Sequence, residues 1–473
     1  MEINKIFLIA IAALGIYWIS PQKQRNGVLL LASFILYANI HIRFAILLFV
    51  SCAIDYALSI AIQRTEDKTR RRLFLILGIC SNIGIWFFFK YFIDFLLFLF
   101  PNVHGLTYLI LPLGLSFYTF HKLSYLVDVY KRKAVPPYFS DYLLYVTYFP
   151  KLISGPIERI GPFLSQLSRE KNIRNVDLKG SFYLIIWGLF KKFVISASLV
   201  VVISQILSIK EHSLTQILLL GYFALLNIYT DFSGYTDIVR GISKLFCIEL
   251  SINFDFPFFT KNPLEHFKKW HITLMTWMRD YIYMPLFVHF SSKKIIYGIK
   301  NPRLRFGIPA IVALFLTFLV YGFWHSDRHY LLIGVLAFFV ICVFIVFEQL
   351  CGRWFVQKRR VVNNAIDYAR MAINFHVIAL LSFTSVVPIG ENVSFVRSAF
   401  FHTGLWIFKY ISLQVLLLLV FFVVYEFLQY IRRDALFIIK KNFIVQIMFY
   451  LILFFLFINT GEIQNTGFIY FQF

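Results

Sequence analysis

Residues 306–325 read FGIPAIVALFLTFLVYGFWH and contain no aspartate, glutamate, lysine or arginine. A helix needs about 20 apolar residues to cross the hydrocarbon core of a bilayer, so this stretch predicts a membrane-spanning helix. It ends in Gly322-Phe323-Trp324-His325, which places an ionisable side chain at the end of the apolar run. Such a side chain at membrane depth is costly and usually faces a partner or a water-filled path. The stretch therefore indicates both the class of fold and a candidate functional residue.

The composition of the whole chain extends this prediction. Of its 473 residues, 59% are hydrophobic and 15% are charged, and the mean hydropathy is +0.73. A soluble domain is about 45–50% apolar and about 25% charged. So much apolar surface cannot be covered in a water-facing globule, which excludes a soluble enzyme, a disordered protein and a secreted disulfide scaffold. We expect an all-α polytopic membrane protein.

The charge excess fits the same class. The chain has 46 lysine and arginine residues against 24 acidic ones, a formal net charge of +22. In membrane proteins basic residues gather in short cytoplasmic loops and near anionic headgroups. We therefore assign the excess to membrane topology and expect no nucleic-acid partner. The five cysteines form no CxxC pair and no metal-ligand spacing, so no metal site is predicted.

We expect about 11–12 membrane helices in a single membrane-embedded domain over residues 1–473, the first of them an uncleaved span. The candidate spans are 4–20, 27–40, 43–63, 73–100, 106–127, 180–208, 213–230, 306–325, 329–350, 366–387, 405–430 and 443–459. The basic clusters between these spans do not always lie an even number of crossings apart. Either some spans are wrongly bounded, or some segments enter the membrane without crossing it.

Two stretches are candidates for such partial insertion. Residues 141–167 begin apolar and are then broken by three prolines and two glycines, a backbone tolerated at membrane depth only where protein or a cavity satisfies its polar groups. Residues 262–285 predict one helix, which begins at the N-cap Asn262 and ends at Pro285. Its apolar face is formed by Leu264, Phe267, His271, Leu274, Met278 and Tyr281. Because charges lie off this face, we expect the helix to lie in the interface or dip into a cavity without crossing.

Two of the eleven histidines stand out by context. His271 occupies a position of the apolar face where leucine or phenylalanine would pack better, and His325 ends the apolar run 306–325. A histidine can act as a general base because its ordinary pKa lies near neutrality. Alternatively, His271 is a buried residue bonded to a carbonyl, and His325 lies in an interfacial turn. Three acidic residues in apolar surroundings are more simply ion-pair partners of nearby basic residues: Asp128, Asp231 and Asp237.

Six sequence blocks in order now carry a resemblance. They are LPLGLSFYTFHKLSYLVDVYK (111–131), YVTYFPKLISGPIERIGPFLSQL (145–167), YTDFSGYTDIVRGISKLFCIELSINFDFPF (229–258), FKKWHITLMTWMRDYIYMPL (267–286), LTFLVYGFWH (316–325) and FIYFQF (468–473). With them the chain resembles the membrane-bound O-acyltransferase superfamily. It looks closest to the bacterial branch of the alginate O-acetyltransferase membrane subunit and the D-alanyl lipoteichoic acid transfer protein.

The resemblance implies a multi-helix fold around a central funnel or tunnel, with re-entrant or interfacial segments. It implies that His325 is the catalytic histidine and that His271 is the second histidine of the site. A base must take the proton of a hydroxyl as it attacks an acyl carbonyl, which is the role expected of His325. His271 is expected to orient the substrate or stabilise the oxyanion. The residues expected to bind substrate are Trp324, Trp270, Asp237 and Arg279.

The implied reaction moves an acyl group, expected to be acetyl, to hydroxyls of an extracytoplasmic glycan or cell-wall polymer. The donor is expected on the cytoplasmic side, as acetyl-CoA or an acylated carrier protein, with no bound cofactor. The resemblance places the chain in the cytoplasmic (inner) membrane, in contact with lipid. It implies a periplasmic acyltransferase or a cytoplasmic carrier protein as partner. The alternatives are D-alanyl transfer from a carrier protein toward teichoic acid, and a non-catalytic transporter; a transporter predicts paired inverted repeats, and none is apparent.

The chain departs from the family pattern at three places. Ser326 and Asp327 follow the catalytic histidine, where the family usually has glycine. His121 stands where the family often has glutamine. Residues 287–294 read FVHFSSKK in place of the Gly-Gly-Asn-Arg run of the alginate-type members. For this reason the acceptor of the alginate branch does not carry over to this chain.

Overall fold

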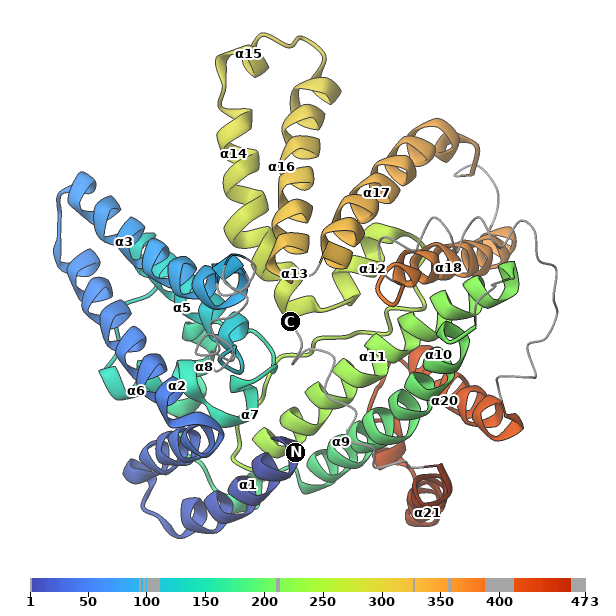
Figure 1. Ribbon diagram of the computed structural model, residues 1–473, viewed down its shortest axis with the longest axis horizontal. Helices are drawn as coiled ribbons and strands as arrows, with labels where there is room; N and C mark the ends of the chain where they lie inside the picture. Colours follow the sequence, from blue (N-terminus) through green and yellow to red (C-terminus); the bar gives the residue numbers. More distant parts are fainter. Residues whose placement is uncertain are drawn as a thin grey trace. The chain divides into compact units, whose positions relative to one another are not determined.

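The structure, a computed structural model, describes residues 2–92, 95–96, 99, 111–209, 213–325, 328–355, 360–387 and 412–460 (Figure 1). Within these ranges all regular structure is helical, as the sequence predicts. The segment Ser326–Asp327, the whole block at 468–473, and parts of three predicted spans lie outside the described residues.

The chain divides into two compact units. The first consists of Met1–Ile185 and Thr236–Ser251, and the second of Ile186–Tyr235 and Ile252–Phe473. Two helices, α9 (Leu178–Phe190) and α11 (Leu214–Lys244), pass from one unit into the other. The single domain over residues 1–473 stays a prediction.

The first unit begins with the helices of the N-terminal third. Its elements besides parts of α9 and α11 are α1 (Glu2–Ile19), η1 (Gln22–Gln24), α2 (Arg25–Arg64), α3 (Lys68–Phe87), η2 (Phe88–Phe92), α5 (Leu115–Tyr130), α6 (Phe139–Thr147), α7 (Phe149–Leu152), α8 (Ile160–Leu167) and η4 (Ile173–Asn175). The predicted spans 27–40 and 43–63 form the two arms of α2, which bends at His41, where φ is −162° and ψ is 110°.

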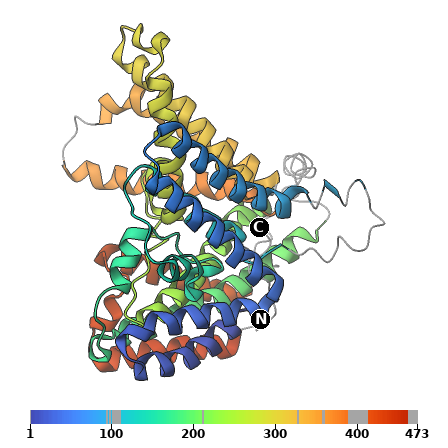
Figure 2. The same cartoon turned by 90° about the vertical axis from the view of Figure 1, so that its left-hand side faces the viewer.

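Polar groups join three helices in the core of this unit. Lys122 of α5 forms a buried ion pair with Asp55 of α2, at 3.1 Å, and Asn82 of α3 donates a hydrogen bond to the same carboxylate at 2.7 Å. Figure 2 shows α2 and α3 side by side in blue. A buried charge pair in an apolar bundle is costly to break, because the remaining charge would have no compensation. These bonds therefore fix the register of α2, α3 and α5.

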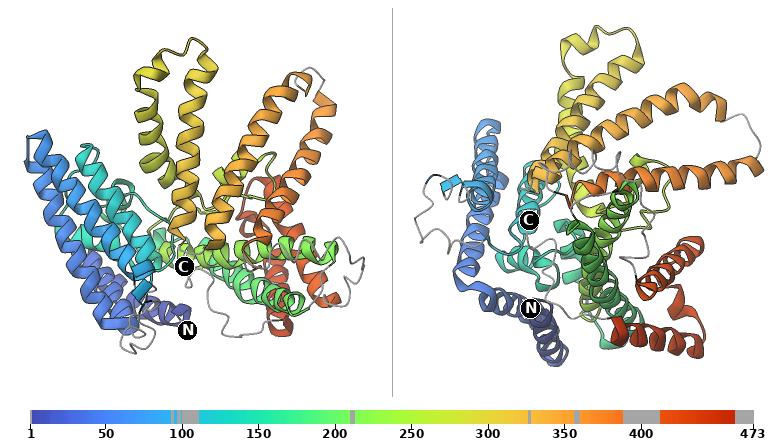
Figure 3. Two further views of the ribbon diagram at one scale, coloured as in Figure 1. Left: turned by 45° about the horizontal axis from the view of Figure 1, so that its top comes forward. Right: turned by 45° about the vertical axis from the view of Figure 1, so that its right-hand side comes forward.

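The second unit contains the helices that carry both candidate histidines. Besides parts of α9 and α11, its elements are η5 (Lys191–Ser196), α10 (Ala197–Leu207), α12 (Pro263–Lys269), α13 (Ile272–Met278), η6 (Arg279–Tyr283), α14 (Met284–Ser291), α15 (Lys294–Tyr297), α16 (Pro302–Trp324), α17 (Arg328–Phe355), α18 (Arg360–Phe383), α20 (Leu413–Arg432), η8 (Phe437–Lys440) and α21 (Phe443–Thr460). Figure 3 shows α14 and α16 as the arms of a hairpin, in yellow, with α15 at its tip.

The prediction of one helix over residues 262–285 is wrong. The predicted start is confirmed: Asn262 accepts a hydrogen bond from the Glu265 amide at 2.8 Å, and the Glu265 carboxylate accepts one from the Lys261 amide at 2.9 Å. The helix then ends at Lys269, because Trp270 has an extended backbone, with φ −105° and ψ 128°. His271 follows with a left-handed backbone, with φ 43° and ψ 51°. The second helical run does not end at Pro285 but continues through α14 to Ser291. A proline near the start of α14 is tolerated because the preceding turn is the wider π-helical η6.

Eight helices among the described residues are long and apolar enough to cross a membrane. They are Gln22–Arg64, Lys68–Phe92, Leu178–Leu207, Leu214–Lys244, Pro302–Trp324, His329–Gln349, Leu413–Arg432 and Phe443–Thr460. The stretch 141–167 contributes only the short helices α6, α7 and α8, which agrees with a segment broken by proline and glycine. The chain is thus an all-α polytopic membrane protein.

Candidate active site

His325 lies at the C-terminal end of α16 and is 4% exposed. Its Nδ1 lies 2.8 Å from the carbonyl oxygen of Tyr321, one helical turn earlier. Because a carbonyl only accepts hydrogen bonds, Nδ1 carries the proton in the neutral ring, and Nε2 is the nitrogen that can take up another. The ring stacks on Tyr330, with centroids 4.7 Å apart and planes at 13°. The hydrogen bond to Tyr321 and the stacking on Tyr330 together hold the imidazole in one orientation. Its role as a general base stays a prediction.

A glycine contact between α16 and α17 makes this stacking possible. A Cβ added at Gly322 would lie 2.7 Å from both the Cα of Leu331 and the carbonyl oxygen of Tyr330. The two helices therefore approach closely only because Gly322 has no side chain, as in other membrane helix pairs with small residues at the contact. This close approach brings Tyr330, at the start of α17, over the ring of His325.

His271 lies in the break between α12 and α13, in the same unit as His325. It is 1% exposed, and its ring meets the edge of Phe232 at 4.7 Å between centroids. Burial holds the pKa of His271 well below its ordinary value, and the nearby His325 lowers it further. His271 is therefore a neutral imidazole near neutral pH, able to donate one hydrogen bond without carrying a charge.

The two tryptophans predicted to bind substrate directly precede these histidines in the sequence, and both are buried. Trp270 is 8% exposed and stacks on His266, with centroids 5.4 Å apart, while Phe254 meets it edge-on at 5.2 Å. Trp324 is 9% exposed at the end of α16. Both side chains belong to the interior around the histidines, and their contact with substrate stays a prediction.

The other two predicted substrate-binding residues are placed differently. Arg279 in η6 has an exposed side chain that pairs with the neighbouring Asp280 at 2.8 Å. Asp237 lies in the part of α11 that belongs to the first unit, where it pairs with Arg240 at 3.3 Å. The alternative role of Asp237 as an ion-pair partner is therefore present in the structure. Substrate binding by either residue stays a prediction.

Sequence reasoning missed partners that are distant in the chain. Asp231 pairs with a basic residue, as expected, but that residue is Lys192 of η5 and not a neighbour in sequence. Tyr229 donates a hydrogen bond to Glu426 of α20 at 2.9 Å. The sequence patterns also did not predict that Tyr330 and Asn253 lie near the histidines. For Tyr330 the sequence offers an indication, because it follows soon after the GFWH motif; for Asn253 it offers none.

His121, the departure from glutamine, is a structural residue of the first unit. Its Nδ1 donates to the carbonyl of Phe117 at 2.8 Å, and its Nε2 accepts from the amide of Glu158 at 3.1 Å. Both ring nitrogens are thereby occupied. The Glu158 carboxylate in turn accepts hydrogen bonds from the amide and hydroxyl of Ser251, at 2.6 and 3.0 Å. The glycine- and proline-rich loop after α7 is thus held by side chains that satisfy its buried backbone.

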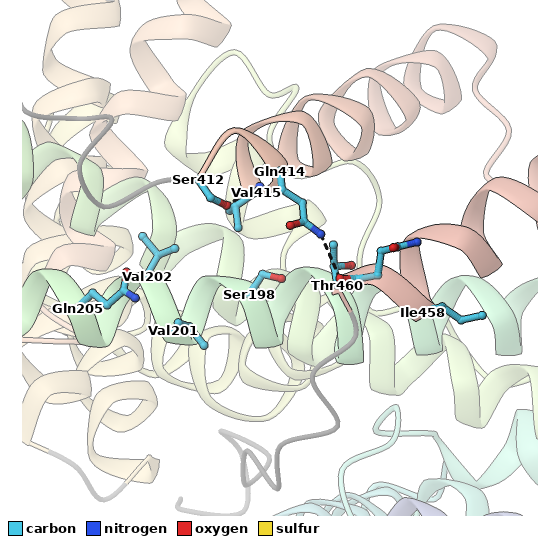
Figure 4. Close-up of a pocket in the computed structure, with 10 residues that line it drawn as sticks. Ser198, Val201, Val202, Gln205, Ser412, Gln414, Val415, Ile458 and Thr460 are labelled. Atoms are coloured by element: carbon cyan, nitrogen blue, oxygen red, sulfur yellow. Dashed lines mark hydrogen bonds between the residues drawn. The ribbon is translucent and has the colours of Figure 1, made fainter.

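A cavity of about 280 Å³ lies elsewhere in the second unit, between α10 and the facing ends of α20 and α21 (Figure 4). Hydroxyl and amide side chains form much of its lining: Ser198, Gln205, Ser412, Gln414, Asn459 and Thr460. It contains none of the predicted site residues. Within the described ranges no three histidine, cysteine or acidic side chains cluster as a metal site would require.

Comparison with known proteins identifies the family. The family model for the membrane-bound O-acyltransferase family matches residues 81–387, which include both histidines. The chain belongs to the membrane-bound O-acyltransferase family.

The chain is similar to several bacterial proteins of known or probable activity. The chain is 33% identical over 363 residues to a peptidoglycan O-acetyltransferase of Helicobacter pylori, an alignment that covers 68% of this chain and 66% of the relative. It is 30% identical over 332 residues to a probable alginate O-acetylase of Pseudomonas aeruginosa, covering 68% and 61%. A teichoic acid D-alanyltransferase of Streptococcus thermophilus is 26% identical over 49% of this chain and 55% of its own length. The chain thus spans about two thirds or less of the length of these three relatives.

Proposed function

We propose that this protein transfers an acyl group, namely acetyl, to hydroxyl groups of a cell-envelope glycan. The observation that carries the proposal is the fixed tautomer of His325. Nδ1 donates its proton in a hydrogen bond to the Tyr321 carbonyl, so Nε2 is the unprotonated nitrogen. The side chain is buried, and Nε2 is therefore oriented to act as a base inside the protein. A hydroxyl is a weak nucleophile until such a base removes its proton.

In the proposed reaction His325 Nε2 takes the proton of the acceptor hydroxyl as its oxygen attacks the acyl carbonyl. The neutral His271 donates a hydrogen bond to the oxyanion that forms on the former carbonyl oxygen. Collapse of this intermediate breaks the bond to the donor's leaving group, the thiol sulfur of a thioester such as acetyl-CoA. The leaving sulfur takes the proton back from His325, so the base returns to its starting state.

The relatives support acetyl over D-alanyl as the transferred group. The two O-acetylating relatives align over 68% of this chain at 30–33% identity, against 49% of the chain at 26% identity for the D-alanyltransferase. We further propose that the protein lies in the cytoplasmic (inner) membrane, with donor and acceptor on opposite sides. Its proposed partners are the acceptor polymer and either a periplasmic acyltransferase or a cytoplasmic carrier protein.

His325→Ala tests the proposal in cells that lack their own envelope O-acetylation. Ester-linked acetate is released by mild alkali from peptidoglycan and from exported polysaccharide and measured by chromatography. The wild type should restore the acetate. His325→Ala should lower its rate of appearance about 10²–10⁴-fold, the usual effect of losing a general base.

His376→Ala is the matched control, because Nδ1 of His376 makes the same bond to a carbonyl one turn earlier, at 2.7 Å, on an exposed face. It should transfer acetate at the wild-type rate. The proposal fails if His325→Ala, present in the membrane at the wild-type level, transfers acetate normally. Release of D-alanine in place of acetate would show that the second class of donor is used.

A further inference from the structure

The first turn of α13 is not capped by the residue that precedes it. His271 holds the N-cap position but makes no side-chain capping bond. The first amides of a helix have no partner within the helix and need one from elsewhere. Asn253, from the irregular segment before α12, supplies it. The backbone carbonyl of Asn253 accepts a hydrogen bond from the Ile272 amide at 2.9 Å. Its side-chain Oδ1 accepts hydrogen bonds from the Thr273 hydroxyl at 2.6 Å and from the Thr273 amide at 3.4 Å.

The same segment also holds the other side of the turn. The amide of Asp255 donates to the carbonyl of Lys269, the last residue of α12, at 3.1 Å. Residues 253–255 therefore bind the chain immediately before and immediately after Trp270 and His271. A left-handed backbone on a residue other than glycine persists only where the surroundings impose it. These bonds are the surroundings that impose φ 43° on His271.

The side chain of Asn253 is only half used by these bonds. It is 2% exposed, and its Nδ2 has no hydrogen-bond partner within the described part of the chain. An unpartnered buried donor is unfavourable. In the described part of the chain the Asn253 amide therefore makes hydrogen bonds through its oxygen alone. Its acceptor half is directed wholly at the turn that carries His271.

We infer that Asn253 is a positioning residue for His271: it caps α13 from a separate segment and fixes the left-handed turn that orients the imidazole of His271. The expected effect of Asn253 on the reaction rate rests on the proposed acyl transfer. The expected effect of Asn253 on the backbone at His271 is independent of that proposal. Misplacing a catalytic group by about 1 Å can cost about 10²-fold in rate, so loss of this cap should act mainly on kcat.

Asn253→Ala and Asn262→Ala form a matched pair of variants. Each removes the side-chain cap of one short helix in the same stretch, since Asn262 caps α12 through the Glu265 amide at 2.8 Å. Both should lower the melting temperature by similar amounts. Asn253→Ala should lower kcat about 10²-fold with little change in KM for the acyl donor, whereas Asn262→Ala should keep kcat within about twofold of wild type. Thr273→Val, which removes only the 2.6 Å bond, should lower kcat less than Asn253→Ala does.

Hydrogen exchange of the detergent-solubilised full chain gives a readout besides activity. Asn253→Ala should speed exchange at the Thr273 amide, which loses its side-chain acceptor, and Asn262→Ala should speed exchange at the Glu265 amide instead. Unchanged exchange at Thr273 would overturn the inference whether or not the wild type transfers acetate. Faster exchange with an undiminished kcat would also overturn it, since the cap would then be purely structural. An inactive wild type with the expected exchange pattern would overturn the proposed function and leave the capping intact.

Discussion

At the scale of single residues, His325 and His271 differ in how far the sequence predicts them. The place of His325 at the end of an apolar run is visible in the sequence, and a histidine there can bond to the carbonyl four residues earlier. The backbone of His271 is not visible, because helical periodicity assigns it a position on a continuous face. One left-handed residue leaves the spacing of apolar residues on either side almost unchanged. The pattern therefore predicts the burial of His271 correctly and its conformation wrongly.

That conformation decides how the role of His271 is tested. Leucine at φ 43° would be strained, by about 1–2 kcal/mol, so a loss of activity in His271→Leu would not separate chemistry from folding. Glycine adopts this backbone freely and removes the ring. His271→Gly should lower kcat about 10²–10³-fold, the usual cost of losing an oxyanion donor.

His271→Asn is the companion variant, since asparagine tolerates the left-handed region and keeps a side-chain N–H donor. It should retain more activity than His271→Gly. Acetate transfer and thermal unfolding are measured on both variants. Wild-type kcat in His271→Gly would mean that the ring only fills space.

At the scale of elements, the short helix α12 is the one whose start the sequence predicts best. Its N-cap, first-turn proline and third-position glutamate are local signals. They start the helix whatever conformation the chain adopts after it. Its end depends on Asn253 and Asp255, which reach it from outside the helix, and no pattern within residues 262–285 reports them. The same holds for the pairs Lys122–Asp55 and Lys192–Asp231, whose members lie on different helices.

The helix α12 also contains a pH-sensitive group. Burial lowers the pKa of His266 from 6.5 to about 4, while its Nδ1 donates to the Pro257 carbonyl at 3.0 Å. Below pH 6.5 the unfolded chain gains a proton at this residue that the folded chain does not. Stability from this group is therefore complete above pH 6.5 and is lost as pH falls toward 4, by up to about 1.4 kcal/mol per pH unit.

The melting temperature in detergent, measured from pH 7 to pH 4, checks this expectation. Wild-type protein should melt at progressively lower temperature as the pH falls. His266→Gln, which can keep the bond to Pro257 but does not titrate, should show a shallower dependence. Equal slopes for the two proteins would mean that His266 is protonated in the folded state as readily as in the unfolded one.

At the scale of the whole molecule, composition alone settles the membrane class, because no soluble packing covers a chain that is 59% hydrophobic. To predict the path of the chain through the membrane, the positions of its charged residues are needed as well. In the second unit, the hairpin tip, from the end of α14 into the first turn of α16, carries Lys293, Lys294, Lys300, Arg303 and Arg305. The stretch before α18, GRWFVQKRR (352–360), is similarly basic. From their sequence, the positive-inside rule predicts both stretches on the cytoplasmic side.

These two positions predict a re-entrant path with His271 at its apex. Lys261 pairs with Asp367, in the part of α18 nearer the basic stretch, so we expect the segment 261–291 to begin toward the cytoplasm. We expect it to end toward the cytoplasm as well, because the basic tip follows Ser291. Between these ends the chain turns at His271, near His325 at the far end of α16. The segment would then enter the membrane and return, which would place His271 close to His325 without a complete crossing.

Single cysteines at Lys261 and His289, in a background without the five native cysteines, test this path. Inside-out and right-side-out vesicles are treated with a maleimide that does not cross membranes. Both positions should react in inside-out vesicles and stay protected in right-side-out ones. Leu413→Cys, at the opposite end of α20 from the basic loop 432–441, is the control and should react from the other side. Reaction of Lys261 and His289 from opposite sides would mean that this segment crosses the bilayer, and that His271 lies along a span and not at a turn.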